Sequence, residues 1–499
     1  MYKLLLILRY LRKRRIAWVS LGAVMLCTTM VLVVISIMGG WLRSFEGKAR
    51  ELSGDLVISA NSLGGFAYYQ DVIDKLKDVG EVQAAVPVIR CFGMLSIGRD
   101  TTKGVQVQGY PVDQIGKVTR FPSSLYCQYR QLIEEAKSPN TTAEKRLALL
   151  KQAEVSATRA SFAKPLPAER YDARVRKSSQ WSGMIVATGV LGISKWADGS
   201  ETGREPDQYL QPIKLSVMNV NSQKVSDAGA VTSRPYWIVD DSHTGTWLND
   251  ENNVYVPFDL VQVDAGMDEQ AVTDPQSDKI SARPARTHEI HVRVKPGVPL
   301  GLVKAKVTAV VNGIFDAREA GESSAQHAWW SIRPEVQTWR EAQSNFIDAV
   351  EKQKVLVVVL FAIISVVAIF LVFCIFYMIV AEKTRDIGII KSVGASDGGV
   401  AAIFLGYGAA IGIAGGGLGL LLGYLIVHNI NVIHFMLGRW MGITVWKPEV
   451  YIFDTIPNQI DPLEATIIVS VAILASIAGA AVPAYRASRM HPIEALRWE

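Results

Sequence analysis

The sequence predicts an integral membrane protein with four transmembrane helices and a large α+β domain inserted between the first two. Four runs contain no charged residue, and they lie at 16–38, 355–381, 400–427 and 465–484. A bilayer core of about 30 Å is crossed by about 20 apolar residues in a helix, so each run is long enough to span it. The stretch at 42–354 reads as a globular domain outside the membrane.

We expect the first run to be retained as a helix over 16–41, not removed as a signal peptide. A cleaved signal peptide has an apolar core of about 7–15 residues, followed by a small-x-small cleavage site. Here the apolar run is longer and ends in Met38-Gly39-Gly40-Trp41.

The positions of lysine and arginine predict that both ends of the chain are cytoplasmic. Basic residues gather before the first run, between the second and third, and after the fourth: Lys3, Arg9, Arg12, Lys13, Arg14, Arg15, Lys383, Arg385, Lys391, Arg486, Arg489 and Arg497. The longer loop between the third and fourth runs carries only Arg439 and Lys447. Cytoplasmic loops are enriched in such residues, which sets the orientation of the spans.

The expected organisation is a cytoplasmic segment at 1–15, transmembrane helices at 16–41, 355–381, 400–427 and 465–484, an extracytoplasmic domain at 42–354, cytoplasmic segments at 382–399 and 485–499, and an extracytoplasmic loop at 428–464.

Small residues recur at four-residue spacing in the third and fourth helices. They are Gly408, Gly412 and Gly416, then Gly415, Gly419 and Gly423, then Ala475 and Gly479, and Ser476 and Ala480. Such spacing lets helix backbones approach closely in lipid. Two interpretations stay open: tight packing within one four-helix subunit, or a seam that slides or joins a second copy.

Two split β-α-β units are predicted in the extracytoplasmic domain. The first has strands at 55–59 and 82–97 around a helix at 68–78. The second repeats the order late in the domain, with strand, helix and extended segment at 289–294, 302–314 and 329–336. Alternating or short apolar runs with flanking turn residues support the strands. The two units could share one sheet.

The middle of the domain predicts a mainly β subdomain and a polar insertion. Strand signals occur at 184–188, 213–220, 236–239 and 254–258. Between about 128 and 176 the chain becomes polar and charged with few aromatic residues, which predicts a solvated helical insertion.

Several classes of protein and site are disfavoured. A net charge of +5 over 499 residues is small, and a nucleic-acid binder needs a basic patch. The sequence has no Cys/His spacing typical of a metal site and no G-x-x-x-x-G-K-[ST] loop for nucleotide phosphates. We therefore expect no metal, no cofactor and no ATP hydrolysis by this chain. His288 and His291 are predicted to be surface residues, and a disulfide between Cys91 and Cys127 is left open.

The stretch AEKTRDIGIIKSVGAS, at 381–396, separates two apolar runs with charged residues. On a helix, Ile387, Ile390 and Val393 fall close to one face, and Gly394 suits the helix end, where a left-handed residue is common. The sequence therefore predicts a short amphipathic helix at the cytoplasmic surface. It is either a solvated connector held to anionic lipid or a docking element for a cytoplasmic protein.

This stretch resembles the signature that follows the second helix in the FtsX/MacB-like superfamily of ABC transporter permeases. The C-terminal stretch VPAYRASRMHPIEALRWE resembles the closing motif of that superfamily. The positions that we assign to this second motif are Pro483, Arg486, Pro492, Glu494 and Leu496.

Within the superfamily, the chain most resembles the lipoprotein-releasing permeases of the LolC/LolE type. The resemblance lies in the first helix and in the stretches at 236–262 and 338–354. It does not extend to the insertion near 128–176. It also departs at Val239-Asp240-Asp241, where the family pattern has a glycine.

The resemblance implies a non-catalytic permease subunit of the mechanotransmission type. Such a permease pairs with a second copy or a related permease and with two cytoplasmic ATPase subunits. The helix after the second span carries the ATPase motion to the other side of the membrane. The residues expected to couple to the ATPase are Glu382, Arg385, Asp386, Ile387, Ile390, Lys391 and Gly394.

The implied cargo is a lipoprotein, lifted from the outer leaflet of the bacterial inner (plasma) membrane and passed to a periplasmic lipoprotein carrier. Two alternatives stay open. One is a MacB-like exporter of drugs, peptides or other periplasmic substrates. The other is an FtsX-like signalling scaffold that controls cell-wall hydrolases.

We expect lipid cargo to bind near the outer ends of the first two helices. Met38, Gly40 and Trp41 are predicted to line an acyl-chain cleft with Val357 and Phe361. The alternative for the tryptophan is ordinary anchoring at the membrane interface. Each buried CH₂ contributes about 0.8 kcal/mol, so release of three chains would require closure of the cleft driven by ATP.

Overall fold

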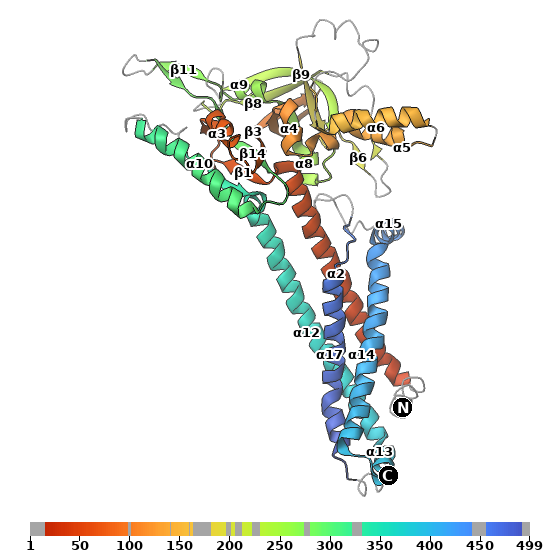
Figure 1. Ribbon diagram of the computed structural model, residues 1–499. Coiled ribbons are helices and arrows are strands. Elements are labelled where there is room, and N and C mark those ends of the chain that lie inside the picture. The colour runs from red at the N-terminus through yellow and green to blue at the C-terminus, as the bar shows by residue number, and fades with distance from the viewer. Residues whose placement is uncertain are drawn as a thin grey trace. The chain divides into compact units, whose positions relative to one another are not determined.

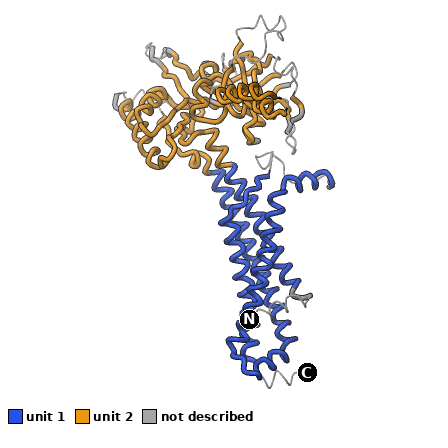
Figure 2. The backbone as a smooth tube through the Cα atoms, turned by 45° about the vertical axis from the view of Figure 1, so that its right-hand side comes forward, with its two compact units in different colours: residues 1–44, 345–445, 456–499 blue, residues 45–344, 446–455 orange. Residues whose placement is uncertain are grey.

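Four long helices form one part of the chain, and a large mixed sheet forms the other (Figure 1). In this computed structural model, the helical unit consists of residues 1–44, 345–445 and 456–499, and the sheet unit of residues 45–344 and 446–455 (Figure 2). The structure describes residues 15–97, 101–139, 141–158, 160–162, 181–195, 201–204, 212–221, 230–273, 280–321, 332–441 and 456–491.

Each predicted span lies within one long helix. These helices are α2 (Arg15–Ser53), α12 (Ser344–Glu382), α14 (Asp397–His428) and α17 (Pro462–Ser488). All four are long and apolar enough to cross a membrane. The first two continue well beyond the apolar runs. The short helices α13 (Thr384–Ser392) and α15 (Ile430–Met441) flank α14.

The two glycine rows of α14 face two different helices of the same chain. A Cβ atom at Gly408 or Gly412 would lie 2.7–3.1 Å from atoms of Ser476, Ala480 or Ile473 in α17. The second row, Gly415, Gly419 and Gly423, packs against Val24, Thr28 and Leu32 of α2. Within the described residues, these rows therefore make tight contacts inside one helical unit, which favours the first of the two interpretations.

Two β-α-β units interleave in the sheet unit. The first is β1 (Leu56–Ser59), α3 (Tyr69–Leu76) and β3 (Val82–Ile97). The second is β14 (Glu289–Val294), α10 (Leu300–Gly321) and β15 (Glu335–Thr338). Their strands run in the order β15-β1-β14-β3, and every neighbouring pair is antiparallel.

The two halves of the long strand β3 pair with different strands. Its first half, 82–88, pairs with β14. Its second half pairs with β4 (Thr101–Tyr110) on one edge and with β8 (Pro212–Met218) on the other. The strand order β3-β4-β10-β5-β9-β8 therefore returns to β3 and closes a barrel. The other barrel strands are β5 (Ser182–Ala187), β9 (Val231–Ser242) and β10 (Asn253–Pro257).

Apolar side chains on alternate residues fill the barrel, as the two-residue period of a strand requires. In β8, Ile213, Leu215 and Val217 are buried while their neighbours are more exposed. The strand β4 and the closure of the barrel were not predicted from the sequence.

The remaining described elements are shorter or peripheral. They are β2 (Phe66–Ala67), α4 (Val112–Val118), η1 (Phe121–Ser124), η2 (Tyr126–Arg130), α5 (Gln131–Lys137), α6 (Ala143–Thr158), β6 (Ser194–Lys195), β7 (Glu201–Thr202), α8 (Trp247–Asn252), α9 (Phe258–Asp264), β11 (Gln270–Thr273), β12 (Ile280–Arg283), β13 (Arg286–Thr287) and α11 (Trp339–Ala342).

The prediction that His288 and His291 lie on the surface is wrong. His291 is 1% exposed, and its Nε2 lies 2.8 Å from a carboxylate oxygen of Glu289. His288 is also buried, with Nε2 2.9 Å from the carbonyl oxygen of Leu63. Helices cover both faces of β14: Ile290 and Val292 pack in one apolar core with α10, and α4 lies against the other face, where Arg293 donates to the carbonyl of Val118.

Cys91 and Cys127 are not joined by a disulfide. Burial raises the pKa of the Cys91 thiol to about 12, so this thiol stays protonated at neutral pH and acts as a packing group.

The sequence departs from the family pattern at the insertion near 128–176 and at Val239-Asp240-Asp241. These two segments contact each other in the structure. The carboxylate of Asp240 accepts backbone N–H bonds from Cys127 (2.8 Å) and Gln128 (3.0 Å), where the insertion begins. Beside it, Asp241 accepts two bonds from Arg204, whose guanidinium lies 3.4 Å from the ring centre of Tyr126. The acidic pair therefore anchors the first turn of the insertion to β9.

Candidate functional site

The first candidate site is α13, the helix predicted from the stretch at 381–396. A break at Lys383 separates it from α12, and the Lys383 side chain binds the carboxylate of Asp386. At its other end, Gly394 has φ +102°, as the predicted left-handed helix end requires. Its N–H donates to the carbonyl of Lys391 at 3.0 Å. Ser396 then begins α14 by accepting the N–H of Gly399 at 3.2 Å.

One face of α13 is fastened to the rest of the helical unit. Ile387 is 3% exposed and belongs to an apolar cluster with Val400, Phe404 and Ala484. The ammonium group of Lys391 donates to the carbonyl oxygens of Ser488 (2.6 Å) and Met490 (2.9 Å) and pairs with Asp397 (2.8 Å). It thereby satisfies carbonyl groups at the C-terminal end of α17, where a cation is favoured.

The opposite face of α13 is open. Arg385, Ile389 and Val393 are exposed and stand four residues apart, so they form one stripe. Val393 is 83% exposed, which is unusual for an apolar side chain at a helix end. Large exposed apolar groups in a contiguous patch mark interaction sites.

The structure divides the predicted coupling residues between these two faces. Glu382, Arg385 and Gly394 are exposed, whereas Ile387 and Lys391 make contacts inside the chain. Ile389 was not among the predicted coupling residues, and Val393, predicted to share a face with Ile387, is exposed whereas Ile387 is buried. The four-residue spacing of 385, 389 and 393 was the signal for this stripe, but which face packs inward depends on α14 and α17.

Only part of the predicted C-terminal motif lies among the described residues. Pro483 is buried within α17. Arg486 donates to the hydroxyl of Tyr377 in α12, and its guanidinium lies 5.0 Å from the centre of that ring. This contact joins the C-terminal halves of α12 and α17. Pro492, Glu494 and Leu496 lie outside the described residues.

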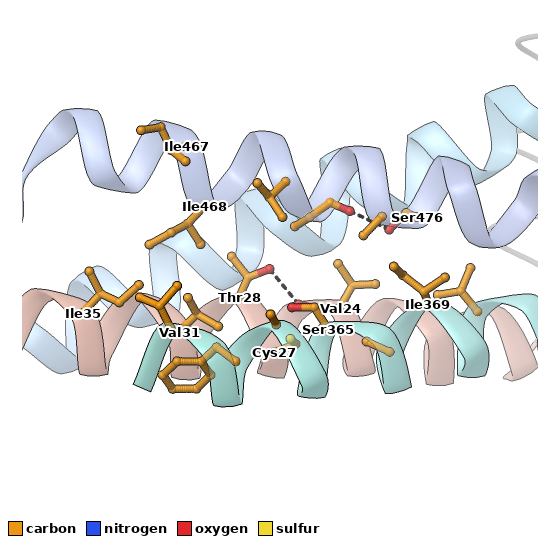
Figure 3. Close-up of a pocket in the computed structure, with 18 residues that line it drawn as sticks. Val24, Cys27, Thr28, Val31, Ile35, Ser365, Ile369, Ile467, Ile468 and Ser476 are labelled. Carbon is orange, nitrogen blue, oxygen red and sulfur yellow. Dashed lines mark hydrogen bonds between the residues drawn. The ribbon is translucent and has the colours of Figure 1, made fainter. Parts of the chain in front are cut away.

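The second candidate site is a cavity of about 210 Å³ among α2, α12 and α17 (Figure 3). Its lining is apolar except for Cys27, Thr28, Ser365 and Ser476. The hydroxyl of Thr28 donates to the carbonyl of Val24 at 2.8 Å, and that of Ser476 to the carbonyl of Ala472 at 3.0 Å. Because their own helices satisfy these hydroxyls, the cavity presents a mainly apolar surface.

One of the five residues predicted for the acyl-chain cleft, Phe361, lines this cavity. The others, Met38, Gly40, Trp41 and Val357, are not part of its lining. The ring of Trp41 lies 5.5 Å from that of Phe346. A Cβ atom at Gly40 would lie 3.2 Å from Pro457, so that glycine serves close packing.

Two ion pairs join the helices near one end of the cavity. Lys354 and Glu464, one turn beyond lining residues of α12 and α17, are 2.8 Å apart. Arg43 of α2 and Asp461 are 3.3 Å apart. These pairs hold the three helices together at that end, whereas the lining itself consists of apolar contacts.

The comparisons with known proteins point to the same helices. The family model described as FtsX-like permease C-terminal matches residues 358–492, a span that includes α13, α14 and α17. The lipoprotein-releasing system transmembrane protein LolC of Neisseria meningitidis serogroup B is 30% identical over 164 residues, 33% of this chain and 40% of that protein.

Two further likenesses are weaker. The lipoprotein-releasing system transmembrane protein LolE of Haemophilus influenzae is 29% identical over 121 residues, which cover 24% of this chain and 29% of the relative. The periplasmic region of MacB from Actinobacillus actinomycetemcomitans aligns with 59% of this chain and 93% of that structure. The TM-score of this alignment is 0.28 and the identity is 9%.

The chain thus matches about two-fifths of the length of the Neisseria relative. The FtsX-like domain and the LolC and LolE relatives confirm the resemblance predicted from the two motifs, which is a resemblance to the FtsX/MacB-like superfamily of ABC transporter permeases.

Proposed function

We propose that this chain is a permease subunit that releases lipoproteins from the outer leaflet of the bacterial inner membrane to a periplasmic carrier. The LolC and LolE relatives support this cargo, and the two-sided arrangement of α13 supports the permease mechanism. One face is bound to α14 and α17 through Ile387 and Lys391, and the other presents Arg385, Ile389 and Val393. A partner that pushes on the open face would move both helices, because the other face is fastened to them.

The proposed partner on that face is a cytoplasmic ABC ATPase, two copies of which would serve a pair of permeases. In the proposed orientation of the chain in the membrane, both termini and α13 are cytoplasmic, and the sheet unit is periplasmic. Burial of a large aliphatic side chain contributes about 1.5–3 kcal/mol. We therefore assign more of the docking energy to Ile389 and Val393 than to the surface charges, which contribute about 0–1 kcal/mol per pair.

A direct test replaces both exposed aliphatic residues. Ile389→Ser with Val393→Ser should abolish co-purification of the ATPase, while the permease still inserts in the membrane. Ser392→Ala, an exposed neighbour on the same helix, is the control and should bind normally. ATPase binding that is unchanged in the double variant would refute docking on this face.

The cavity among α2, α12 and α17 is the proposed site for an acyl chain of the cargo. Its surface is mainly apolar, and three separate helices line it, so a shift of one helix would change its size. Acyl chains bind through the apolar area that they bury. Helix movement driven through α13 would therefore release cargo without a route across the bilayer.

Native cysteines allow a matched test of cargo binding. Cys27 lines the cavity, whereas Cys374 is exposed on α12 and does not line it. Two variants would each keep one of these cysteines and replace the other three. A photo-activated cross-linker on Cys27 should capture an acylated protein from cells that contain the whole transporter, and one on Cys374 should not. Capture of small apolar substrates alone at Cys27 would favour the exporter instead.

Orientation is tested separately. Leu63 in the sheet unit is 82% exposed, and Ser396 before α14 is exposed. In a background without native cysteines, an impermeant thiol reagent should label Leu63→Cys in cells with a permeable outer membrane. Label at Ser396→Cys under the same conditions would contradict the orientation.

A further inference from the structure

The helix α15 carries an exposed apolar stripe that neither the packing of the helical unit nor the proposed transport cycle uses. Val432, Met436 and Trp440 stand four residues apart, and their exposed fractions are 59%, 64% and 94%. Phe435 beside them is 45% exposed. A row of large apolar side chains at this spacing lies on one face of a helix.

The rotation of α15 is fixed by its opposite face. The side chain of Asn431 donates to the carbonyl of Ile456 at 3.0 Å and accepts the N–H of Ile456 at 2.9 Å. Asn431 therefore faces the chain segment that returns toward α17. Val432, Met436 and Trp440 lie on another side of the helix, and the described residues leave this side uncovered.

The position of α15 in the chain indicates what covers the stripe. The helix begins two residues after the end of α14, one of the four helices able to span a membrane. The last turns of α14 already present Leu421, Tyr424 and Leu425 as exposed apolar groups. Figures 1 and 2 show that α15 turns aside from the axis of α14 instead of continuing it.

The length and composition of α15 fit the interface between lipid and water. It has 12 residues, and an apolar stretch of about 10–14 residues is too short to span the bilayer. Trp440 is of the type enriched at headgroup level, and Arg439 is exposed beside it. An arginine at this depth can reach lipid phosphates while its neighbours enter the acyl region.

We infer that α15 is an interfacial helix that lies in the leaflet at the end of α14, with Val432, Met436 and Trp440 immersed among lipid chains and Arg439 at the phosphates. If the orientation proposed above holds, this is the outer leaflet. The inference itself needs only the membrane insertion of α14, so failure of the proposed cargo or orientation would leave it intact.

The test measures the depth of spin labels on the full-length protein in lipid nanodiscs. Single cysteines at Met436 and Trp440 carry the label, in a chain whose four native cysteines are replaced. Leu421 on α14 is the lipid-facing control, and Leu63 is the water-facing control. Labels at 436 and 440 should collide with a water-soluble nickel chelate several-fold less often than the label at Leu63, and with oxygen about as often as the label at Leu421.

Two outcomes would overturn the inference. Nickel collisions at 436 and 440 equal to those at Leu63 would place the stripe in water. Loss of collisions with both nickel and oxygen would mean that protein covers it, such as a second copy of the chain. A further variant guards against misfolding: Val432→Lys should raise nickel access at Trp440 several-fold, whereas the conservative Val432→Ile should leave it unchanged.

Discussion

The helical unit and the sheet unit are stabilised by different kinds of contact. In the helical unit, glycines such as Gly412 and Gly419 bring helices together, and ion pairs or charge-to-carbonyl contacts occur near helix ends. In the sheet unit, a large apolar core is combined with buried carboxylates such as Asp55 and Asp240. Each of these carboxylates accepts hydrogen bonds from the backbone.

The solvent explains this difference. In water, burial of apolar side chains drives folding, and a buried carboxylate is tolerated where donors surround it. In lipid, apolar side chains gain little from leaving the solvent, so close backbone packing between small residues replaces the hydrophobic effect. Substitutions should therefore harm the two units by different mechanisms.

The largest effect is expected at Asp55 of the sheet unit. Its side chain is 1% exposed and binds Arg50 at 2.7 Å and the N–H of Val294 at 2.9 Å. Asp55→Ala should lower the free energy of unfolding by about 3 kcal/mol, because buried donors lose their partner. Pulse proteolysis in urea measures this loss. The exposed ion pair between Asp74 and Lys77 is the control, and Asp74→Ala should lower the free energy of unfolding by less than about 1 kcal/mol. Equal losses in the two variants would contradict the prediction.

A steric change should have the next largest effect, in the helical unit. A Cβ atom at Gly412 would lie 2.8 Å from the Cα of Ile473, whereas one at Gly417 meets nothing within 4 Å. Gly412→Leu should therefore separate α14 from α17 and cost about 1–3 kcal/mol, the usual range for overpacking. Thermal unfolding in nanodiscs is the measurement, with Gly417→Leu as the matched control. Equal unfolding temperatures of the two variants would contradict this packing explanation.

A pH-dependent effect is expected at Asp240. Burial raises the pKa of this carboxyl to about 7, and the nearby Asp241 adds to the rise, while backbone N–H bonds from Cys127, Gln128 and Asp241 oppose it. The unfolded value is about 3.9, so the folded state binds a proton more tightly. The resulting stability is full below about pH 4 and is lost as pH rises toward 7.

Between pH 6 and 7 this loss amounts to about 1 kcal/mol from the single group. Urea unfolding of the protein at both pH values should show it, and the same measurement on Asp240→Asn should not, since an amide does not titrate in this range. Hydrogen exchange at the amides of Cys127 and Gln128 should also quicken in Asp240→Asn. An unchanged pH slope in the variant would show that another group is responsible.

The smallest global effect is expected at Lys391. Lys391→Met removes a cation from the carbonyls of Ser488 and Met490, so the end of α17 should loosen by about 1 kcal/mol. Hydrogen exchange across α13 and residues 486–490 should rise. The exposed Arg385→Met is the control and should leave exchange in the isolated chain unchanged. Similar exchange in both variants would refute the fastening role of Lys391.

The four spanning helices, the short helix α13 and its end at Gly394 were all readable from the sequence. Each depends on neighbours along the chain: an apolar run of sufficient length, a charged interruption, or a residue that needs positive φ. The resemblance to FtsX/MacB-like permeases was also readable, because its motifs are contiguous stretches. Local pattern was sufficient for these features.

The tertiary structure decided which surfaces are inside. His291 is buried because α4, which is far from it in the sequence, covers its face of β14, where Arg293 donates to the carbonyl of Val118. Lys391 contacts carbonyl groups inside the chain because the end of α17 returns to it. Asp240 anchors the insertion because β9 lies beside Cys127. In each case the deciding partner is more than 90 residues away or on another strand, and periodicity within one segment carries no information about such partners.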